Sequence, residues 1–231
     1  MISETRLARG YASFWRTIAP TMEMFVKRCN LDLYDRIFEP LQSSVNAERR
    51  AIVNQFAFEM FGLAPNDTAL INVRDLLASD GLRASAAATL SVPPDELKGS
   101  EVIEARELAW RMWSHFHIPQ PTEIIFKPLY HGCGIVISCL GDVYDNSGTI
   151  VEMKDGDRPF RSYEFRQISV YAALYYNQHG TIPRRLQVVN SRRGTAITID
   201  TEDFSREVAG QSAYTYLYGI IRMVSESTTS Q

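Results

Sequence analysis

Residues 141–154, with the sequence GDVYDNSGTIVEMK, limit what this chain can fold into more than any other segment does. They read as two short strands joined by a polar turn. Because side chains alternate between the two faces of a strand, Glu152 and Lys154 are predicted to share a face, with Met153 on the other. The hairpin would bring Asp142 alongside this pair. Two carboxylates and a lysine at one place are what a metal-dependent phosphodiesterase needs.

The composition places the chain among ordinary globular proteins. Its 231 residues are 45% apolar and 22% charged, enough for one medium domain, or one domain with an appended lobe. The formal net charge is −3, so any phosphate-binding surface has to be a local patch. Three cysteines without a Cys-x-x-Cys pair predict neither a disulfide framework nor a zinc ribbon. We therefore expect a soluble cytoplasmic protein, without a signal peptide or a membrane partner.

The first part of the chain reads as helical. Apolar residues at helical spacing predict helices over residues 7–18 and around residues 46–61. A boundary is expected near residues 84–99, where Pro93 and Pro94 break the pattern. This predicts a helical region of residues 1–95, followed by a second region of residues 96–231.

The second region mixes helices with short β-rich runs. Ser100 can cap a helix with one apolar face, and strands are predicted at residues 123–126, 134–144 and 149–154. A helix over residues 160–177, a hairpin of residues 186–190 and 195–200, and a closing helix over residues 203–223 follow. Tyrosines at every second position of residues 214–218 suggest that this last helix is less regular. The order predicts an α+β fold with a central mixed β-sheet flanked by helices.

Two interpretations of the residues in the predicted hairpin are open, a metal-binding site and an ordinary surface hairpin. Mg²⁺, or Mn²⁺ in its place, takes oxygen ligands and retains water, so the carboxylates of Asp142 and Glu152 with the Met153 carbonyl would suffice. Lys154 would position the attacking water or stabilise developing charge. The alternative is an ordinary surface hairpin with a Glu-Lys pair.

Helical residues extend this candidate site. Gln167 and Tyr171 lie four apart on the predicted helix 160–177 and so share a face, where they could orient water or phosphate. Glu104, on the helix that begins near Ser100, could reach the strand cluster as a further metal ligand. The alternatives are core packing for Tyr171 and a favourable interaction with the helix dipole for Glu104.

These motifs resemble the PD-(D/E)xK nuclease superfamily, in the branch with a trailing Gln-x-x-x-Tyr motif that includes RecB-like nucleases and lambda-type exonucleases. The resemblance covers roughly residues 99–200 and implies a restriction-endonuclease-like core. It implies that Glu104, Asp142 and Glu152 bind metal, that Lys154 is the catalytic lysine, and that Gln167 and Tyr171 support the site. The chain departs from the pattern at Gly141, where a proline is usual, and in residues 134–137, which carry no acid.

The resemblance implies a Mg²⁺-dependent nuclease that hydrolyses DNA, with exonuclease action as one form of it. The alternatives are a catalytically inactive nuclease fold that binds nucleic acid or serves in assembly, and an RNA endonuclease. The helical first half would shape substrate access, bind a protein partner or self-associate. A phosphate backbone could be followed by the arginine pairs at the two ends of one predicted strand together with Arg158, Arg161 and Arg166, or all of these could serve solubility alone; the pairs are Arg184-Arg185 and Arg192-Arg193.

Overall fold

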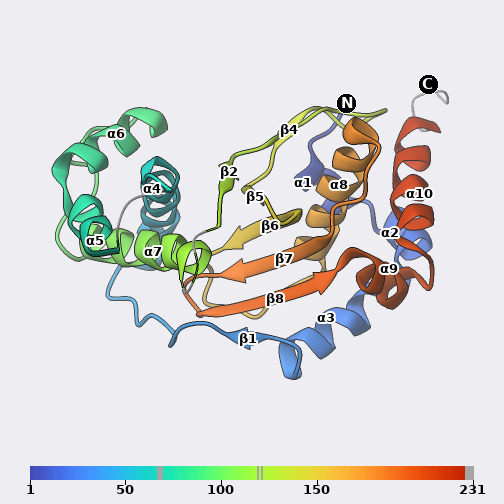
Figure 1. The fold of residues 1–231 in the computed structure, drawn as a ribbon, viewed down its shortest axis with the longest axis horizontal. Helices are drawn as coiled ribbons and strands as arrows, with labels where there is room; N and C mark the ends of the chain where they lie inside the picture. Colours follow the sequence, from blue (N-terminus) through green and yellow to red (C-terminus); the bar gives the residue numbers. More distant parts are fainter. Residues whose placement is uncertain (67–69, 119, 121, 227–231) are drawn as a thin grey trace. The chain divides into compact units, whose positions relative to one another are not determined.

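The structure, a computed structural model, describes residues 1–66, 70–118, 120 and 122–226. Their fold is α+β, with a mixed sheet flanked by helices, as the sequence predicts (Figure 1). The chain divides into two compact units. The first comprises Met1–Arg36, Ile125–Asn190 and Thr195–Gln231, and the second comprises Ile37–Ile124 and Ser191–Gly194. The first three helices belong to the unit that carries the sheet, and the division into regions 1–95 and 96–231 stays a prediction.

Within the described residues, the main sheet has six strands in the order β1-β8-β7-β6-β5-β2, and β3 pairs with β4 separately. The pairing of β5 with β6 and of β7 with β8 is antiparallel, whereas β6 and β7 are parallel. The sheet is therefore mixed, with both predicted hairpins present. The strands are β1 (Asp35–Arg36), β2 (Ile124–Phe126), β3 (Leu129–Tyr130), β4 (Cys139–Leu140), β5 (Val143–Asp145), β6 (Thr149–Lys154), β7 (Arg185–Asn190) and β8 (Thr195–Asp200).

The helices of the first unit surround α8 (Ser162–His179), which packs on β6 and β7. The predicted helix over residues 7–18 is two short helices that meet at Tyr11. Gly180, with φ of 68°, ends α8 in the left-handed conformation that glycine adopts readily. The other helices of this unit are α1 (Glu4–Gly10), α2 (Ala12–Ile18), α3 (Met22–Leu31), α9 (Thr201–Ala209) and α10 (Ala213–Glu226).

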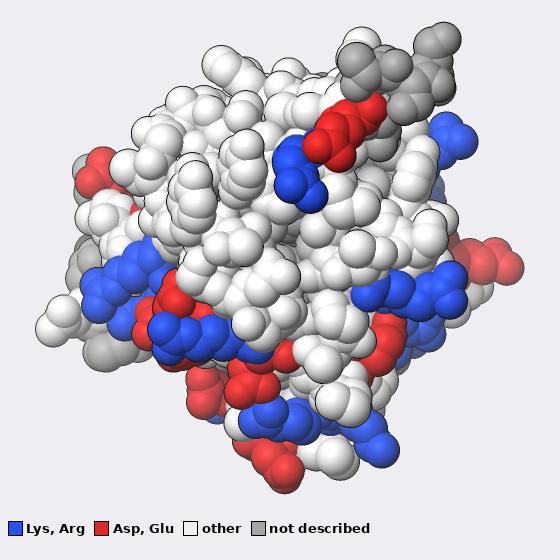
Figure 2. All heavy atoms as spheres, turned by 90° about the vertical axis from the view of Figure 1, so that its right-hand side faces the viewer, with Lys and Arg blue, Asp and Glu red and all other residues white. Residues whose placement is uncertain are grey.

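The predicted closing helix over residues 203–223 is wrong as a single helix. Gly210, with φ of 66°, ends α9, and α10 begins at Ala213. The tyrosine-rich segment is regular helix: the exposed rings of Tyr214 and Tyr218 stack one turn apart with their centroids 5.9 Å apart, while Tyr216 is buried. Figure 2 views the protein from the α10 side, where charged side chains gather mainly along the lower part of the face.

The predicted strand over residues 134–144 is also largely wrong, since only its last part forms β4 and the start of β5. Residues before β4 are held by partners far away in the chain. The Ile2 N–H donates to the Ile135 carbonyl, and the Ile135 N–H donates to the Val224 carbonyl. A Cβ on Gly134 would lie 2.3 Å from the Val224 carbonyl oxygen, so the close approach of these backbones requires glycine.

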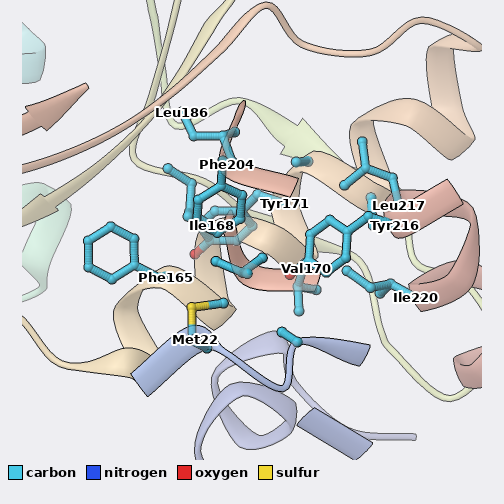
Figure 3. Close-up of a cluster of buried hydrophobic side chains, with 14 of the residues drawn as sticks. Met22, Phe165, Ile168, Val170, Tyr171, Leu186, Phe204, Tyr216, Leu217 and Ile220 are labelled. Atoms are coloured by element: carbon cyan, nitrogen blue, oxygen red, sulfur yellow. The ribbon is translucent and has the colours of Figure 1, made fainter. Parts of the chain in front are cut away.

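The core of the first unit lies between the sheet and its helices (Figure 3). One face of the sheet contributes Ile150, Leu186, Val188 and Ile197, and α8 packs Phe165, Ile168 and Tyr171 against them. Phe204 of α9 and Tyr216 of α10 complete this cluster of buried side chains. It fixes α8 over β6, which is the element that carries Glu152 and Lys154.

The second unit is helical. Its elements are the 3-10 helix Ala47–Arg49, α4 (Arg50–Leu63), α5 (Leu70–Ala78), α6 (Asp80–Leu90) and α7 (Ser100–His117). The helix predicted around residues 46–61 is confirmed, and so is the helix that begins at Ser100. The expected boundary segment of residues 84–99 is helical up to Leu90 and irregular after it, where the two prolines stand. In the described part of the chain, no helix has the length and apolar character that crossing a membrane requires.

Replacing Gly134 by Ala is expected to lower the free energy of unfolding by about 2 kcal/mol or more, because the new Cβ meets backbone and the residue keeps a positive φ. The measurement is urea unfolding followed by circular dichroism. Gly10→Ala in the same unit, where a Cβ has open space, serves as the control and should change stability by less than about 1 kcal/mol. Equal stability of Gly134→Ala and wild type would contradict the close contact.

Candidate active site

The side chain of Asp145, at the end of β5, closes the turn between β5 and β6. The Asp145 carboxylate accepts hydrogen bonds from the backbone N–H groups of Ser147 and Thr149, both at 2.9 Å. Gly148, with φ of 86°, supplies the backbone conformation that the turn needs. Local turn chemistry thus sets the register of the two strands.

This register brings together the residues that the sequence singled out. Val143 pairs with Val151, so continuing the antiparallel pairing by one residue places Asp142 opposite Glu152. Ile150 belongs to the core under α8, and side chains alternate along β6. Glu152 and Lys154 therefore point to the face of the sheet that α8 covers, and Met153 points away, as predicted.

The two carboxylates have different surroundings. Glu152 is 1% exposed, its Oε1 forms an ion pair with the Lys154 ammonium, and its Oε2 has no hydrogen-bond partner among the described residues. Asp142 is half-buried, and its Oδ2 accepts a hydrogen bond from the Met153 N–H at 2.7 Å. Lys154 keeps 23% of its side chain exposed. The cluster thus joins an enclosed carboxylate, a second carboxylate on a half-buried residue, and an ammonium group that solvent can reach.

Burial and mutual repulsion shift the protonation of these groups. Burial raises the pKa of Glu152 to about 8, and the neighbouring Asp142 charge adds to the rise. Burial also raises the pKa of Asp142, against the opposing effects of Lys154 and the Met153 N–H. For Lys154, burial alone would lower the pKa, but the carboxylates of Glu152 and Asp142 outweigh it and the pKa rises. The ammonium group therefore stays protonated at neutral pH.

Helix α8 brings Gln167 and Tyr171 to the same face of the sheet. The Gln167 amide donates a hydrogen bond to the Tyr171 hydroxyl at 2.9 Å, and the Tyr171 ring packs against Tyr130 with centroids 5.3 Å apart. Burial raises the pKa of Tyr171, and the charges of Glu152 and Asp142 raise it further. The phenol therefore remains protonated and lies within electrostatic reach of both acids.

Further acids of the first unit act on this cluster, and two of them, Glu164 and Glu4, were not predicted from the sequence. Glu164 of α8 is buried, pairs with Arg158 at 2.7 Å, and contributes to the raised pKa values of Glu152 and Lys154. Glu4, in the first turn of α1, contributes to the raised pKa of Tyr171. No local motif marks these acids, because tertiary packing around α8 brings them close.

Glu104 belongs to the second unit and has partners within it. Its carboxylate accepts hydrogen bonds from Ser43 at 2.7 Å and from Arg192 at 2.7 Å. Arg192 is 1% exposed and also donates to the Asn54 side chain at 2.7 Å. Glu104 is thus one partner of a buried ion pair, and its role as a metal ligand stays a prediction.

The acid pair on the sheet fits a divalent cation. When both acids are ionised, two carboxylates share one ammonium group and a buried oxygen of Glu152 lacks a partner, so a bound cation would offset the repulsion and desolvation that raise both pKa values. Mg²⁺ is commonly held by one or two carboxylates with water and substrate phosphate. In the described part of the chain, three or more His, Cys, Asp or Glu residues do not gather into a group that could hold a metal. The Met153 carbonyl as a ligand stays a prediction.

No protein-family model matches the chain, and no curated protein matches it. The resemblance to the PD-(D/E)xK nucleases therefore rests on the residues of the hairpin and of α8.

The protonation of Glu152 predicts a pH dependence of stability in metal-free buffer. Its pKa is about 8 in the folded protein against 4.5 ordinarily, so the folded state binds the proton more tightly. The stabilisation is complete below about pH 4.5 and is lost as the pH rises to about 8. The test is urea unfolding in EDTA between pH 5 and pH 9. The urea concentration at the unfolding midpoint should fall as the pH rises in the wild type, and should change less with pH in Glu152→Gln. A midpoint that falls identically in both proteins would contradict this protonation.

Removing Arg192 is expected to be strongly destabilising, because Glu104 would keep a buried charge without its cation. Arg192→Met should lower the free energy of unfolding by about 3 kcal/mol or more, and adding Glu104→Gln should recover part of the loss. Urea unfolding at pH 7 measures both. The exposed Arg185–Asp200 pair supplies the control, since Arg185→Met should cost less than about 1 kcal/mol. No recovery in the double variant would show that the ion pair is not the cause.

Proposed function

We propose that this protein is a Mg²⁺-dependent nuclease that hydrolyses phosphodiester bonds of DNA. The observation that carries the proposal is the meeting of Asp142, Glu152 and Lys154 under α8, with one carboxylate oxygen buried and unpartnered. A structural ion pair alone would not need a second, desolvated carboxylate beside it, because that carboxylate costs stability unless a cation compensates it.

Asp142 and Glu152 would hold the metal, with the Met153 carbonyl as a further ligand that the sequence predicts. A divalent metal supplies charge neutralisation at the phosphate and a nucleophilic water near neutral pH. Mn²⁺ offers the same oxygen-ligand chemistry and would replace Mg²⁺ in an assay.

Lys154 would act as a cation rather than as a base. Its raised pKa keeps the ammonium group protonated, so it donates hydrogen bonds and does not accept the proton of an attacking water. Partly exposed beside Glu152, the ammonium group can stabilise the negative charge that develops on the phosphate in the transition state.

Gln167 and Tyr171 would support the site from α8. The Gln167 amide fixes the Tyr171 hydroxyl through their hydrogen bond, and Tyr130 restrains the ring. Because the phenol stays protonated, it can orient water or carboxylate oxygens at the edge of the cluster. The two residues position groups and need not touch the scissile phosphate.

The setting is proposed to be the cytoplasm, which the free thiols of Cys29, Cys133 and Cys139 support. DNA is the proposed partner despite the negative net charge, because binding depends on local basic side chains rather than on the total. The predicted binding of a protein partner, or of a second copy, through the helices of the first half is retained as part of the proposal.

The decisive change is Lys154→Ala, assayed on linear and circular DNA with Mg²⁺ or Mn²⁺. Loss of the ammonium group should lower the cleavage rate at least about 100-fold, because it removes charge stabilisation in the transition state. The matched control is Lys98→Ala, an exposed lysine of the second unit, which should cleave as wild type does. Products are measured on denaturing gels, and cleavage of linear substrate alone would identify an exonuclease.

The same assay separates the competing functions. Metal-dependent cleavage that survives Lys154→Ala would place the active site elsewhere. DNA binding without cleavage by the wild type, with either metal, would identify a nuclease fold that binds nucleic acid or serves in assembly. Cleavage of RNA in place of DNA under the same conditions would identify an RNA endonuclease.

A further inference from the structure

A second feature of the first unit is a basic pocket at the beginning of α8. The pocket has a volume of about 430 Å³ and is bounded by α1, α3 and the segment that enters α8. Val26 and Phe160 supply apolar wall, and Asn30 holds the segment in place through two hydrogen bonds with the Phe160 backbone, at 2.8 and 2.9 Å. Four basic side chains line it: Arg9, Lys27, Arg161 and Arg166.

The positive charge of this pocket is only partly compensated. Glu23 is its one acidic lining residue, and it is already bound to Arg166 at 2.8 Å and to the Ser162 hydroxyl at 2.5 Å. Within the described residues, Arg9, Lys27 and Arg161 have no carboxylate partner. Three uncompensated cations therefore face one concavity, in a chain whose acids outnumber its bases 27 to 24. Such a concentration of one sign attracts an anion.

The arrangement fits a phosphate group better than a lone carboxylate. The Arg9 guanidinium lies over the Tyr163 ring, 4.6 Å from its centroid, which restrains a side chain that would otherwise be mobile. Guanidinium groups present paired donors that match the oxygens of a phosphate, and an ammonium group adds a point charge. Three uncompensated positive charges balance a dianion better than a singly charged group. The volume leaves room for a sugar attached to the phosphate.

We propose that this pocket is a phosphate-binding site, separate from the acid pair on the sheet. Its position relates it to the proposed nuclease site: Arg166 lines the pocket, and the next residue, Gln167, belongs to the candidate site. In a nuclease, the pocket would hold a phosphate of the substrate other than the one that is cleaved. Only this role in a nuclease rests on the proposed function.

Binding of inorganic phosphate, measured by calorimetry in EDTA at constant ionic strength, tests the site without any metal or activity. The wild type should bind phosphate, and Arg9→Gln/Lys27→Gln should bind it at least about tenfold more weakly, because two charge-assisted contacts are lost. Both side chains are exposed, so the variant should melt as the wild type does. The control Arg16→Gln/Arg184→Gln removes two exposed arginines of the same unit outside the pocket and should bind phosphate normally.

Oligonucleotides of one sequence with a 5′-phosphate or a 5′-hydroxyl, in the same buffer, distinguish the sources of the phosphate. Preference for the phosphorylated strand that disappears in Arg9→Gln/Lys27→Gln supports the site and assigns it to strand ends. Equal weakening of both strands supports it and assigns it to internal phosphodiesters, and an effect on free phosphate alone supports a small phosphorylated ligand. No binding of phosphate by the wild type, or equal loss in the control, overturns the proposal. Neither result bears on cleavage, which Lys154→Ala tests independently.

Discussion

The burial of Glu152 beside Asp142 is the constraint on which the candidate site depends. Two carboxylates on one face of a sheet, under a packed helix, repel each other and lose hydration, so they resist ionisation. The ammonium group of Lys154 compensates only part of the free-energy cost of ionising both carboxylates. The apolar cluster of Figure 3, which includes Leu186 and Tyr216, fixes α8 over the sheet and so keeps the two carboxylates buried. The packing of the apolar core thus offsets the free-energy cost of burying two carboxylates at the candidate site.

The sequence was sufficient where local rules decide the structure. The β5–β6 hairpin follows from Asp145 and Gly148 at its turn, and strand alternation then predicts which side chains share a face. Helix α8 and the four-residue step from Gln167 to Tyr171 follow from helical periodicity in the same way. The predicted α+β fold with a mixed sheet is confirmed, because the order of elements alone restricts the architectures available.

The sequence was insufficient where distant segments decide the structure. The run before β4 looks like a strand, but its backbone is paired with Ile2 and Val224, which lie at the two ends of the chain. Gly210 interrupts what its apolar spacing presents as one helix. The second unit also depends on distant segments, since the turn between β7 and β8 contributes Arg192 to it and the ion pair with Glu104 forms there.

Similar residue types therefore have different uses in this chain, and their surroundings distinguish them. Glu104 and Glu152 are both buried acids paired with a cation, yet the Glu104 carboxylate is satisfied by Arg192 and Ser43, whereas Glu152 retains an unpartnered oxygen. Arginines divide likewise: Arg192 is enclosed in a structural ion pair, while Arg161 opens into a pocket. Unsatisfied charge, rather than residue type or motif, marks the places where this protein has capacity to bind something else.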